Sequence, residues 1–435
     1  MVAPYYVTSK NTTPSQIPEL RLKSTQLIRN VFVVLSLAAL LLVTRAEAHQ
    51  STSQSALNDD LVAAALLGNT DAVQHLLAAR ADINGRDRYG NTALTDAASQ
   101  NHADTVRFLL TKGAAIEGTT IHGDTALKSA AKSGQADTVK LLLEYGANSN
   151  ARSGNDDTPL IDAAGGPYLV QTHSEEAKYL VIVKMLLEYK ADIKATNKQG
   201  YTALTCAAQW GHTDTVNLLL DKGAAIEEAD IFGSTPLMSA AAGGRNATVR
   251  LLLAKGAKIE ARDRDGKTAL VYAAVVGYGV GHPETMELLL ANGASIEATD
   301  NKGKTALMRT ASENYMGGHT ETLEMLLAKR AKIEARDNDG ETALILAAAS
   351  SYGHTEALSV LLKNGANIEA TDTSGATPLI RAVIGGYNAP VKLLLDNGAN
   401  IDAKDNGGDT ALTKAISLKR TDIIQLLQIY KKPPR

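Results

Sequence analysis

Two Gly-Lys-Thr triplets, at residues 266–268 and 303–305, come closest in this sequence to a nucleotide-binding motif. A phosphate-binding loop also needs a glycine five residues before the second glycine, because the backbone N–H groups of that loop hold the phosphates. Those two positions are Ala261 and Ala298. The triplets therefore predict no nucleotide site, and no cofactor or small-molecule substrate is expected.

Histidines recur at one position relative to their surroundings, and imidazoles are common metal ligands: His102, His212, His282, His319 and His354. Zinc–nitrogen bonds of about 2.0–2.1 Å would require these rings to lie within roughly 4 Å of one another. Equivalent positions on packed helices are about 8–10 Å apart. We therefore interpret the histidines as residues that hold a turn in register, and we expect no metal site.

Catalytic groups are equally hard to assemble from this sequence. Cys206 is the only cysteine, which excludes an intrachain disulfide, and we interpret it as a half-buried bystander on a helix. Acidic residues follow Ile at regular intervals, which indicates a solvated edge rather than an acid/base pair: Glu117, Glu227, Glu260, Glu297, Glu334 and Glu369. No His-Glu-x-x-His or Gly-x-Ser-x-Gly motif is present. The sequence predicts no catalytic residues and no enzymatic activity.

All of these residues sit in a phrase that repeats along the chain. Its anchor, Thr followed by Ala or Pro and then Leu, begins at Thr92, Thr125, Thr158, Thr202, Thr235, Thr268, Thr305, Thr342, Thr377 and Thr410. The basic period is 33 residues, with longer gaps of 44, 37, 37 and 35. Self-similarity at such a period is typical of a repeat architecture rather than of unrelated domains.

Each copy of the phrase contains a turn and two helices. Asp-x-x-Gly predicts a tight turn, and the Thr hydroxyl then caps a short helix with small side chains on its packing face. A second helix carries Val216, Leu219 and Leu220 at helical spacing and ends at Gly223, which favours a left-handed cap.

In order, spacing and residue type this phrase resembles the ankyrin repeat, over roughly residues 56–430. The resemblance implies an all-α repeat solenoid of about ten to eleven units, each a helix-turn-helix with a β-hairpin-like turn. The family has a His after Thr-Pro-Leu that bonds to the neighbouring repeat. This sequence replaces it by Thr95, Lys128, Ile161, Thr205, Met238, Val271, Met308, Ile345, Ile380 and Thr413, so the resemblance does not extend to those bonds.

The first 48 residues read as an export signal. Basic residues precede an apolar run at 31–43, and Ala46-Glu47-Ala48 places small residues before a cleavage site. The 13-residue run is shorter than the ~20 residues that span a bilayer. We expect cleavage before His49 and repeats in the periplasm or outside a bacterial cell. The alternative is an uncleaved anchor in the inner membrane, the only membrane contact expected.

The charge of the chain argues against nucleic acid as a partner. The whole sequence has 44 basic and 47 acidic residues, a net charge of −3. Removing residues 1–48 takes away five basic and two acidic residues, which leaves a net charge of −6. Such a surface gives no electrostatic attraction to nucleic acid or to an anionic bilayer.

The predicted boundaries follow the repeat. A linker at 49–55 leads to an N-terminal capping repeat at 56–86, nine internal repeats at 87–404, and a C-terminal capping repeat with a basic tail at 405–435. Extra residues lie between the two helices of a repeat, the longest insertion being at 165–176. There Ser174, Glu175 and Glu176 predict the start of a lengthened second helix.

With no catalytic, metal or nucleotide site predicted, the remaining functional candidate is a binding surface. The resemblance implies that turn tips and first helices form a concave groove for protein partners. Apolar or aromatic residues at the tips are the first candidate: Tyr89, Ile121, His122, Ile231 and Phe232. The alternative is that Ile231 and Phe232 pack on the adjacent hairpin. A second candidate is a ladder of Tyr278, Tyr315, Tyr352 and Tyr387, each ten residues after its Thr, together with Trp210. The ladder either stacks between enlarged loops or offers an amphipathic strip to a partner.

The sequence therefore predicts an exported scaffold that binds a protein or peptide without catalysing a reaction. Two alternatives stay open: a structural spacer, or an effector that acts on host proteins. A third, an enzyme subunit with its site in the 165–176 insertion, has His173, Glu175 and Glu176 but no nucleophile.

Overall fold

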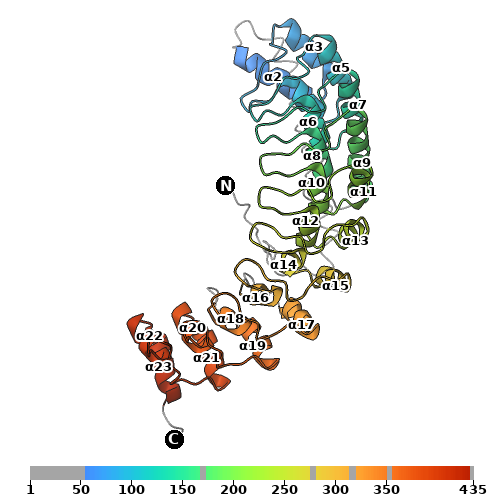
Figure 1. The fold of residues 1–435 in the computed structure, drawn as a ribbon. Coiled ribbons are helices and arrows are strands. Elements are labelled where there is room, and N and C mark those ends of the chain that lie inside the picture. The colour runs from blue at the N-terminus through green and yellow to red at the C-terminus, as the bar shows by residue number, and fades with distance from the viewer. Residues whose placement is uncertain (1–53, 167–172, 275–280, 313–319, 350–354, 432–435) are drawn as a thin grey trace, which may run out of the picture. The chain divides into compact units, whose positions relative to one another are not determined.

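The computed structural model describes residues 54–166, 173–274, 281–312, 320–349 and 355–431. These residues form 22 helices and no strand, apart from isolated bridges between Arg86 and Thr92 and between Thr119 and Thr125 (Figure 1). The chain divides into two compact units, residues 1–154 and 155–435. In both units the helices come in pairs, which confirms the predicted all-helical repeat fold.

The first unit contains α2 (Gln54–Leu66), α3 (Thr70–Ala78), α4 (Ala93–Ser99), α5 (Ala103–Thr111), α6 (Ala126–Lys132) and α7 (Ala136–Glu144). Helix α2 begins at Gln54, so the last two residues of the predicted linker at 49–55 are helical. Gln54 belongs to the helix because its amide nitrogen donates to Asn58 Oδ1 (3.1 Å) and to the Arg80 carbonyl (3.3 Å).

The second unit contains first helices α8 (Pro159–Gly165), α10 (Ala203–Trp210), α12 (Pro236–Ala242), α14 (Ala269–Ala274), α16 (Ala306–Ser312), α18 (Ala343–Ala349), α20 (Pro378–Gly385) and α22 (Ala411–Ser417). Their second helices are α9 (His173–Glu188), α11 (Thr213–Asp221), α13 (Asn246–Ala254), α15 (Pro283–Ala291), α17 (Thr320–Ala328), α19 (Glu356–Lys363), α21 (Asn388–Asp396) and α23 (Thr421–Lys431). Helix α9 has 16 residues against nine in α11, as the insertion predicts.

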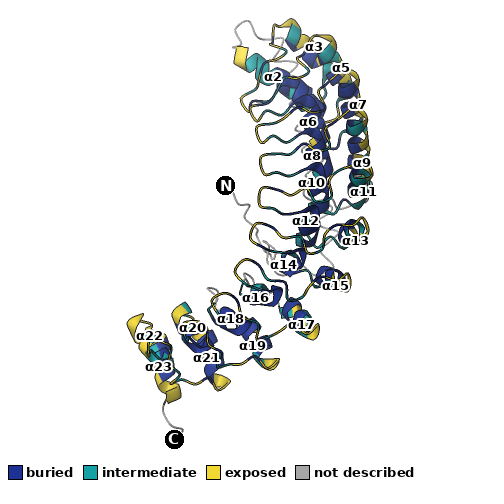
Figure 2. Ribbon diagram, viewed as in Figure 1, coloured by how far each residue is buried: buried dark blue, intermediate teal, exposed yellow. Residues whose placement is uncertain are grey.

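Within each unit a first helix packs on the first helices before and after it, and second helices form the neighbouring row (Figure 1). The contact faces are buried (Figure 2). In α10 the residues Ala203, Leu204, Ala207 and Ala208 are at most 1% exposed. Alanine keeps adjacent backbones close, and each buried leucine contributes about 1.5–3 kcal/mol. One helix pair is too thin to bury these faces alone, so neighbouring repeats do it.

Threonine starts the first helices as predicted. The hydroxyl of each capping threonine accepts a hydrogen bond from the backbone N–H three residues later: Thr92, Thr125, Thr158, Thr202, Thr235, Thr377 and Thr410. Gly223 follows α11 with φ of +92°, the predicted left-handed conformation.

The carboxylate row joins one repeat to the next, although the sequence indicated only a solvated edge. Glu260 Oε1 accepts a hydrogen bond from the backbone N–H of Ser295 (2.7 Å) in the following repeat. The same bond is made at 2.7–2.8 Å by Glu117, Glu227, Glu297, Glu334 and Glu369. A charged acceptor strengthens such a bond, so this row fixes the register of successive repeats.

We expect Glu260→Ala to lower the free energy of unfolding by about 1 kcal/mol, because a hydrogen bond to a carboxylate at an exposed edge is lost. Glu260→Gln keeps an acceptor oxygen and should retain most of the stability. Urea unfolding monitored by circular dichroism measures both. Glu324→Ala, at an exposed position on α17, is the control. Equal losses in Glu260→Ala and Glu324→Ala would contradict the role of the row.

Candidate partner-binding surface

The hairpin tips are held rigidly by backbone hydrogen bonds. Asp230 Oδ1 accepts from the N–H groups of Phe232 and Ser234, both at 2.8 Å, and Gly233 closes the turn with φ of +85°. Adjacent tips are also linked, since Ile231 N–H donates to the Gln199 carbonyl (3.0 Å). A side chain carried on such a tip loses little backbone freedom when it binds.

The first unit carries the predicted tip residues on its surface. Tyr89 is 70% exposed and Ile121 is 61% exposed. The Ile121 side chain lies across Gly90, with Cγ2 only 2.1 Å from where a β-carbon on that glycine would stand. His122 is also exposed. We call Tyr89, Ile121 and His122 the Tyr89 patch.

The second unit carries the other predicted tip residues. Phe232 is 59% exposed and Ile231 is 42% exposed, so packing on the adjacent hairpin covers neither side chain completely. Exposed cations lie on the tips to either side, Lys198 and Arg264, and neither has an ion-pair partner among the described residues. We call Ile231, Phe232, Lys198 and Arg264 the Phe232 patch. It combines apolar area with uncompensated positive charge.

The predicted aromatic ladder is largely outside the described residues, which include neither Tyr278, Tyr315 nor Tyr352. Tyr387 is 37% exposed and is the N-cap residue of α21. His102 and His212 hold the same position before α5 and α11. Tyr387 therefore belongs structurally to the histidine row, in a repeat without an insertion.

Trp210, the other aromatic candidate, ends α10 and is half-buried. Its ring edge lies over the neighbouring repeat, where Cδ1 would be 3.9 Å from a β-carbon on Gly165. Packing between repeats therefore explains at least part of the burial of the Trp210 side chain.

The histidines join repeats, as the interpretation of a register role predicts. Nε2 of His102, His212 and His282 lies 3.0–3.2 Å from a carbonyl oxygen at the end of the preceding first helix. Gln135 and Arg245 make the same bond from the same position. These residues precede the second helix of a repeat, whereas the family's usual His would stand in the first turn of the first helix, where this sequence has Thr95 or Thr205. His319 and His354 lie outside the described residues.

Cys206 and the Gly-Lys-Thr triplets offer no reactive arrangement. Burial raises the pKa of the Cys206 thiol to about 12, which leaves almost no thiolate near neutral pH. Lys267 and Lys304 form ion pairs with Asp265 (3.1 Å) and Asp337 (3.7 Å). Of the 165–176 insertion, residues 167–172 lie outside the described part of the chain, and Glu176 lies 3.8 Å from His212 Nδ1.

The comparison with protein families bears directly on this geometry. A family model described as "Ankyrin repeats (3 copies)" matches residues 61–153, 153–230, 225–300, 276–372 and 348–433. The chain belongs to the ankyrin-repeat family. No curated protein matches this ankyrin-repeat chain. Ankyrin repeats generally mediate protein–protein interaction, and their fold is typically non-enzymatic.

A further surface feature of this ankyrin-repeat protein, missed in the sequence, is a half-buried carboxyl group on α4. Burial, together with the neighbouring Asp87 carboxylate, raises the pKa of Asp96 to about 6. No cation is paired with Asp96 within the described ranges. Its ionised form is therefore disfavoured in the folded protein, and a cationic group from a partner would relieve that penalty.

Replacing Asp96 by Asn should stabilise the protein at pH 8. The pKa of Asp96 is higher in the folded state than its ordinary value of 3.8, so Asp96 costs stability increasingly as pH rises through 4 to 6. After allowance for solvent screening, we expect a gain of about 1–2 kcal/mol at pH 8 that disappears near pH 4. Urea unfolding at both pH values measures it.

The matched control is Asp104→Asn, at an exposed carboxylate in the first turn of α5. This substitution removes only a favourable interaction with the helix dipole, so it should not stabilise the protein. Asp96→Asn with no gain at pH 8, or with the same gain at pH 4, would contradict the assigned burial.

Proposed function

We propose that this ankyrin-repeat protein is a non-enzymatic scaffold that binds a protein or peptide through its hairpin tips and the adjoining first helices. The exposure of Phe232 on a tip fixed by backbone hydrogen bonds is the observation that carries the proposal. Aromatic side chains are favoured anchors at interfaces because they bury a large area at a small entropic cost.

The charges around Phe232 favour one class of partner. Lys198 and Arg264 are exposed on the tips to either side and have no carboxylate partner in the described ranges. A segment that places an apolar side chain on Phe232 and carboxylates on these cations fits this surface. The partner segment is therefore expected to be acidic as well as apolar.

We also propose that the repeats act outside the cytoplasm, in the periplasm or as a secreted protein. The basic, apolar and Ala-x-Ala order of residues 1–48 supports export, although this segment lies outside the described residues. No helix among the described residues has the length and apolar character to cross a membrane.

Site-specific photo-crosslinking in cells tests the binding surface. A benzophenone amino acid in place of Phe232 should give a discrete crosslinked band, and one in place of Arg250, exposed on α13, should not. Phe232→Ser in a chain with the probe at Ile231 should reduce the yield several-fold. Phe232 is exposed, so its replacement should change stability by less than about 0.5 kcal/mol.

Equal crosslinking from Phe232 and Arg250 would contradict a tip-centred interface. The mass of the chain purified from the same cells tests export, because a cleaved protein should begin at His49. A full-length chain in the cytoplasm would contradict export but leave the binding result standing.

A further inference from the structure

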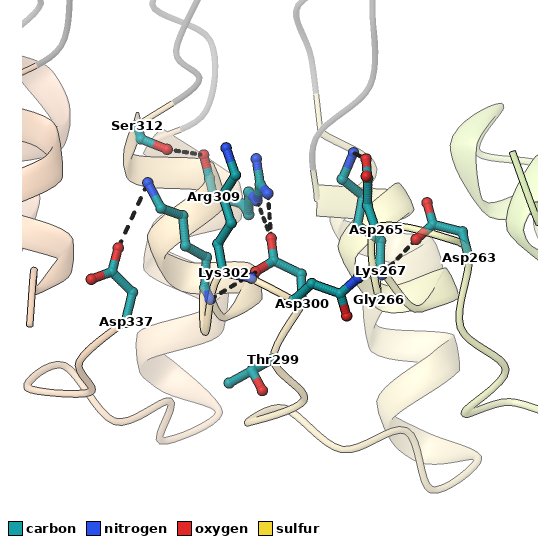
Figure 3. Close-up of polar contacts among 12 residues, drawn as sticks. Asp263, Asp265, Gly266, Lys267, Thr299, Asp300, Lys302, Arg309, Ser312 and Asp337 are labelled. Carbon is teal, nitrogen blue, oxygen red and sulfur yellow. Dashed lines mark hydrogen bonds and ion pairs between the residues drawn. The ribbon is translucent and has the colours of Figure 1, made fainter. Parts of the chain in front are cut away.

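Four of the seven aspartates that open a described hairpin tip have partners for both carboxylate oxygens. Oδ1 caps backbone N–H groups of its own tip, and Oδ2 meets the side chain nine residues later. The four examples are Asp263 with Tyr272 (2.8 Å), Asp300 with Arg309 (2.7 Å), Asp372 with Arg381 (2.5 Å) and Asp405 with Lys414 (2.9 Å). The contacts of Asp300 are drawn in Figure 3.

Asp337 departs from this arrangement. The residue nine positions later is Leu346, which is buried and has no polar group to offer. Oδ1 of Asp337 accepts from the N–H groups of Asp339 (3.0 Å) and Glu341 (2.8 Å). Oδ2 has no hydrogen-bond partner among the described residues, and the side chain is only 1% exposed. Its ion-pair contact, Lys304 Nζ, is 3.7 Å away, which is too long for a hydrogen bond (Figure 3).

Two more carboxylates surround this buried oxygen. Asp337, Asp339 and Glu341 alternate along the tip, and each offers one oxygen within 4.8 Å of the others. Asp339 is exposed and Glu341 is half-buried, so the cluster opens to solvent on one side. Three carboxylates therefore lie together at this tip.

We propose that Asp337, Asp339 and Glu341 bind a hard divalent cation, with Ca²⁺ as the preferred ion. Ca²⁺ binds carboxylate oxygens at about 2.3–2.6 Å, so oxygens up to roughly 5 Å apart can share one ion. Mg²⁺ needs shorter bonds of about 2.0–2.1 Å and a stricter octahedron, which this spacing fits less well. The cation would give Asp337 Oδ2 a close contact in place of the long ion pair with Lys304, and water would complete the coordination.

Two basic side chains set the strength of this site. Lys304 lies 3.7 Å from Asp337, and Arg381 lies 3.6 Å from Glu341. Both compete with a cation, and Lys304 has to move away from Asp337 when the ion binds. Three protein ligands and this competition place the dissociation constant at about 10⁻⁴–10⁻³ M, the range of extracellular calcium modules.

Isothermal titration of the full chain with CaCl₂, in chelator-treated buffer at constant ionic strength, tests the site. One saturable site is expected, weakened at least roughly tenfold by Asp339→Asn and by Glu341→Gln. The matched control is Asp265→Asn, the same position in a tip where Lys267 replaces the third carboxylate; it should bind Ca²⁺ like the unmodified chain.

Replacing the competing Lys304 should change the Ca²⁺ affinity in the opposite direction. Lys304→Met removes the ammonium group beside Asp337 and should tighten Ca²⁺ binding by about threefold to tenfold. Three outcomes overturn the proposal. The first is no saturable binding below 10 mM Ca²⁺, which is roughly ten times the largest dissociation constant expected. The others are a titration that Asp339→Asn leaves unchanged, and a Lys304→Met chain that binds Ca²⁺ no more tightly than the unmodified chain. Mg²⁺ binding as tight as Ca²⁺ binding would overturn the choice of ion.

Discussion

Burial of alanine and leucine faces between neighbouring helix pairs is the interaction on which this structure depends. Ala207 and Ala208 of α10 are completely inaccessible to solvent, although α10 has only eight residues. Flanking first helices, rather than its own second helix alone, cover it. Hydrogen bonds also join neighbouring repeats, because Glu260, His212 and the backbone of the tips each bond to an adjacent repeat. Apolar packing and hydrogen bonding therefore both couple each repeat to its nearest neighbours.

Because the helices provide the buried contacts, the residues at the hairpin tips can vary. The second residue after the opening Asp is Phe232 in one tip, Lys302 in another and Asp339 in a third, while the turn around it keeps the same hydrogen bonds. Core packing therefore places few demands on these positions. An aromatic anchor, a cation and a carboxylate cluster can occupy one edge without changing the fold. Recognition chemistry in this protein is accordingly expected at the tips rather than in a cavity.

Local features were predictable from the sequence, while contacts between repeats mostly were not. Threonine caps, Gly223 and the exposed tips follow from residue type and spacing within one repeat. The bonds of the carboxylate row are not predictable from one repeat, because Glu260 accepts a hydrogen bond from a backbone N–H 35 residues later, and carboxylates spaced by a repeat also fit a solvated edge. Counting ten residues from Thr places Tyr387 with the loop tyrosines, but insertions shift that count, and Tyr387 is the N-cap residue of α21. Within the described ranges, Asp337 Oδ2 lacks a hydrogen bond because the residue nine positions later is the apolar Leu346. The sequence does not show that these two positions face each other, because that depends on how the tip packs against the following helix.

Native-state hydrogen exchange after a single core substitution tests the central claim, that each repeat is held by its neighbours. Leu204→Ala in α10 removes a buried side chain and should cost about 2–5 kcal/mol locally. Amide protection should fall most in α8, α10 and α12 and least in α20 and α22 of the same unit. Equal loss of protection across all these helices would contradict the account, because it would show one cooperative core rather than a stack coupled repeat by repeat.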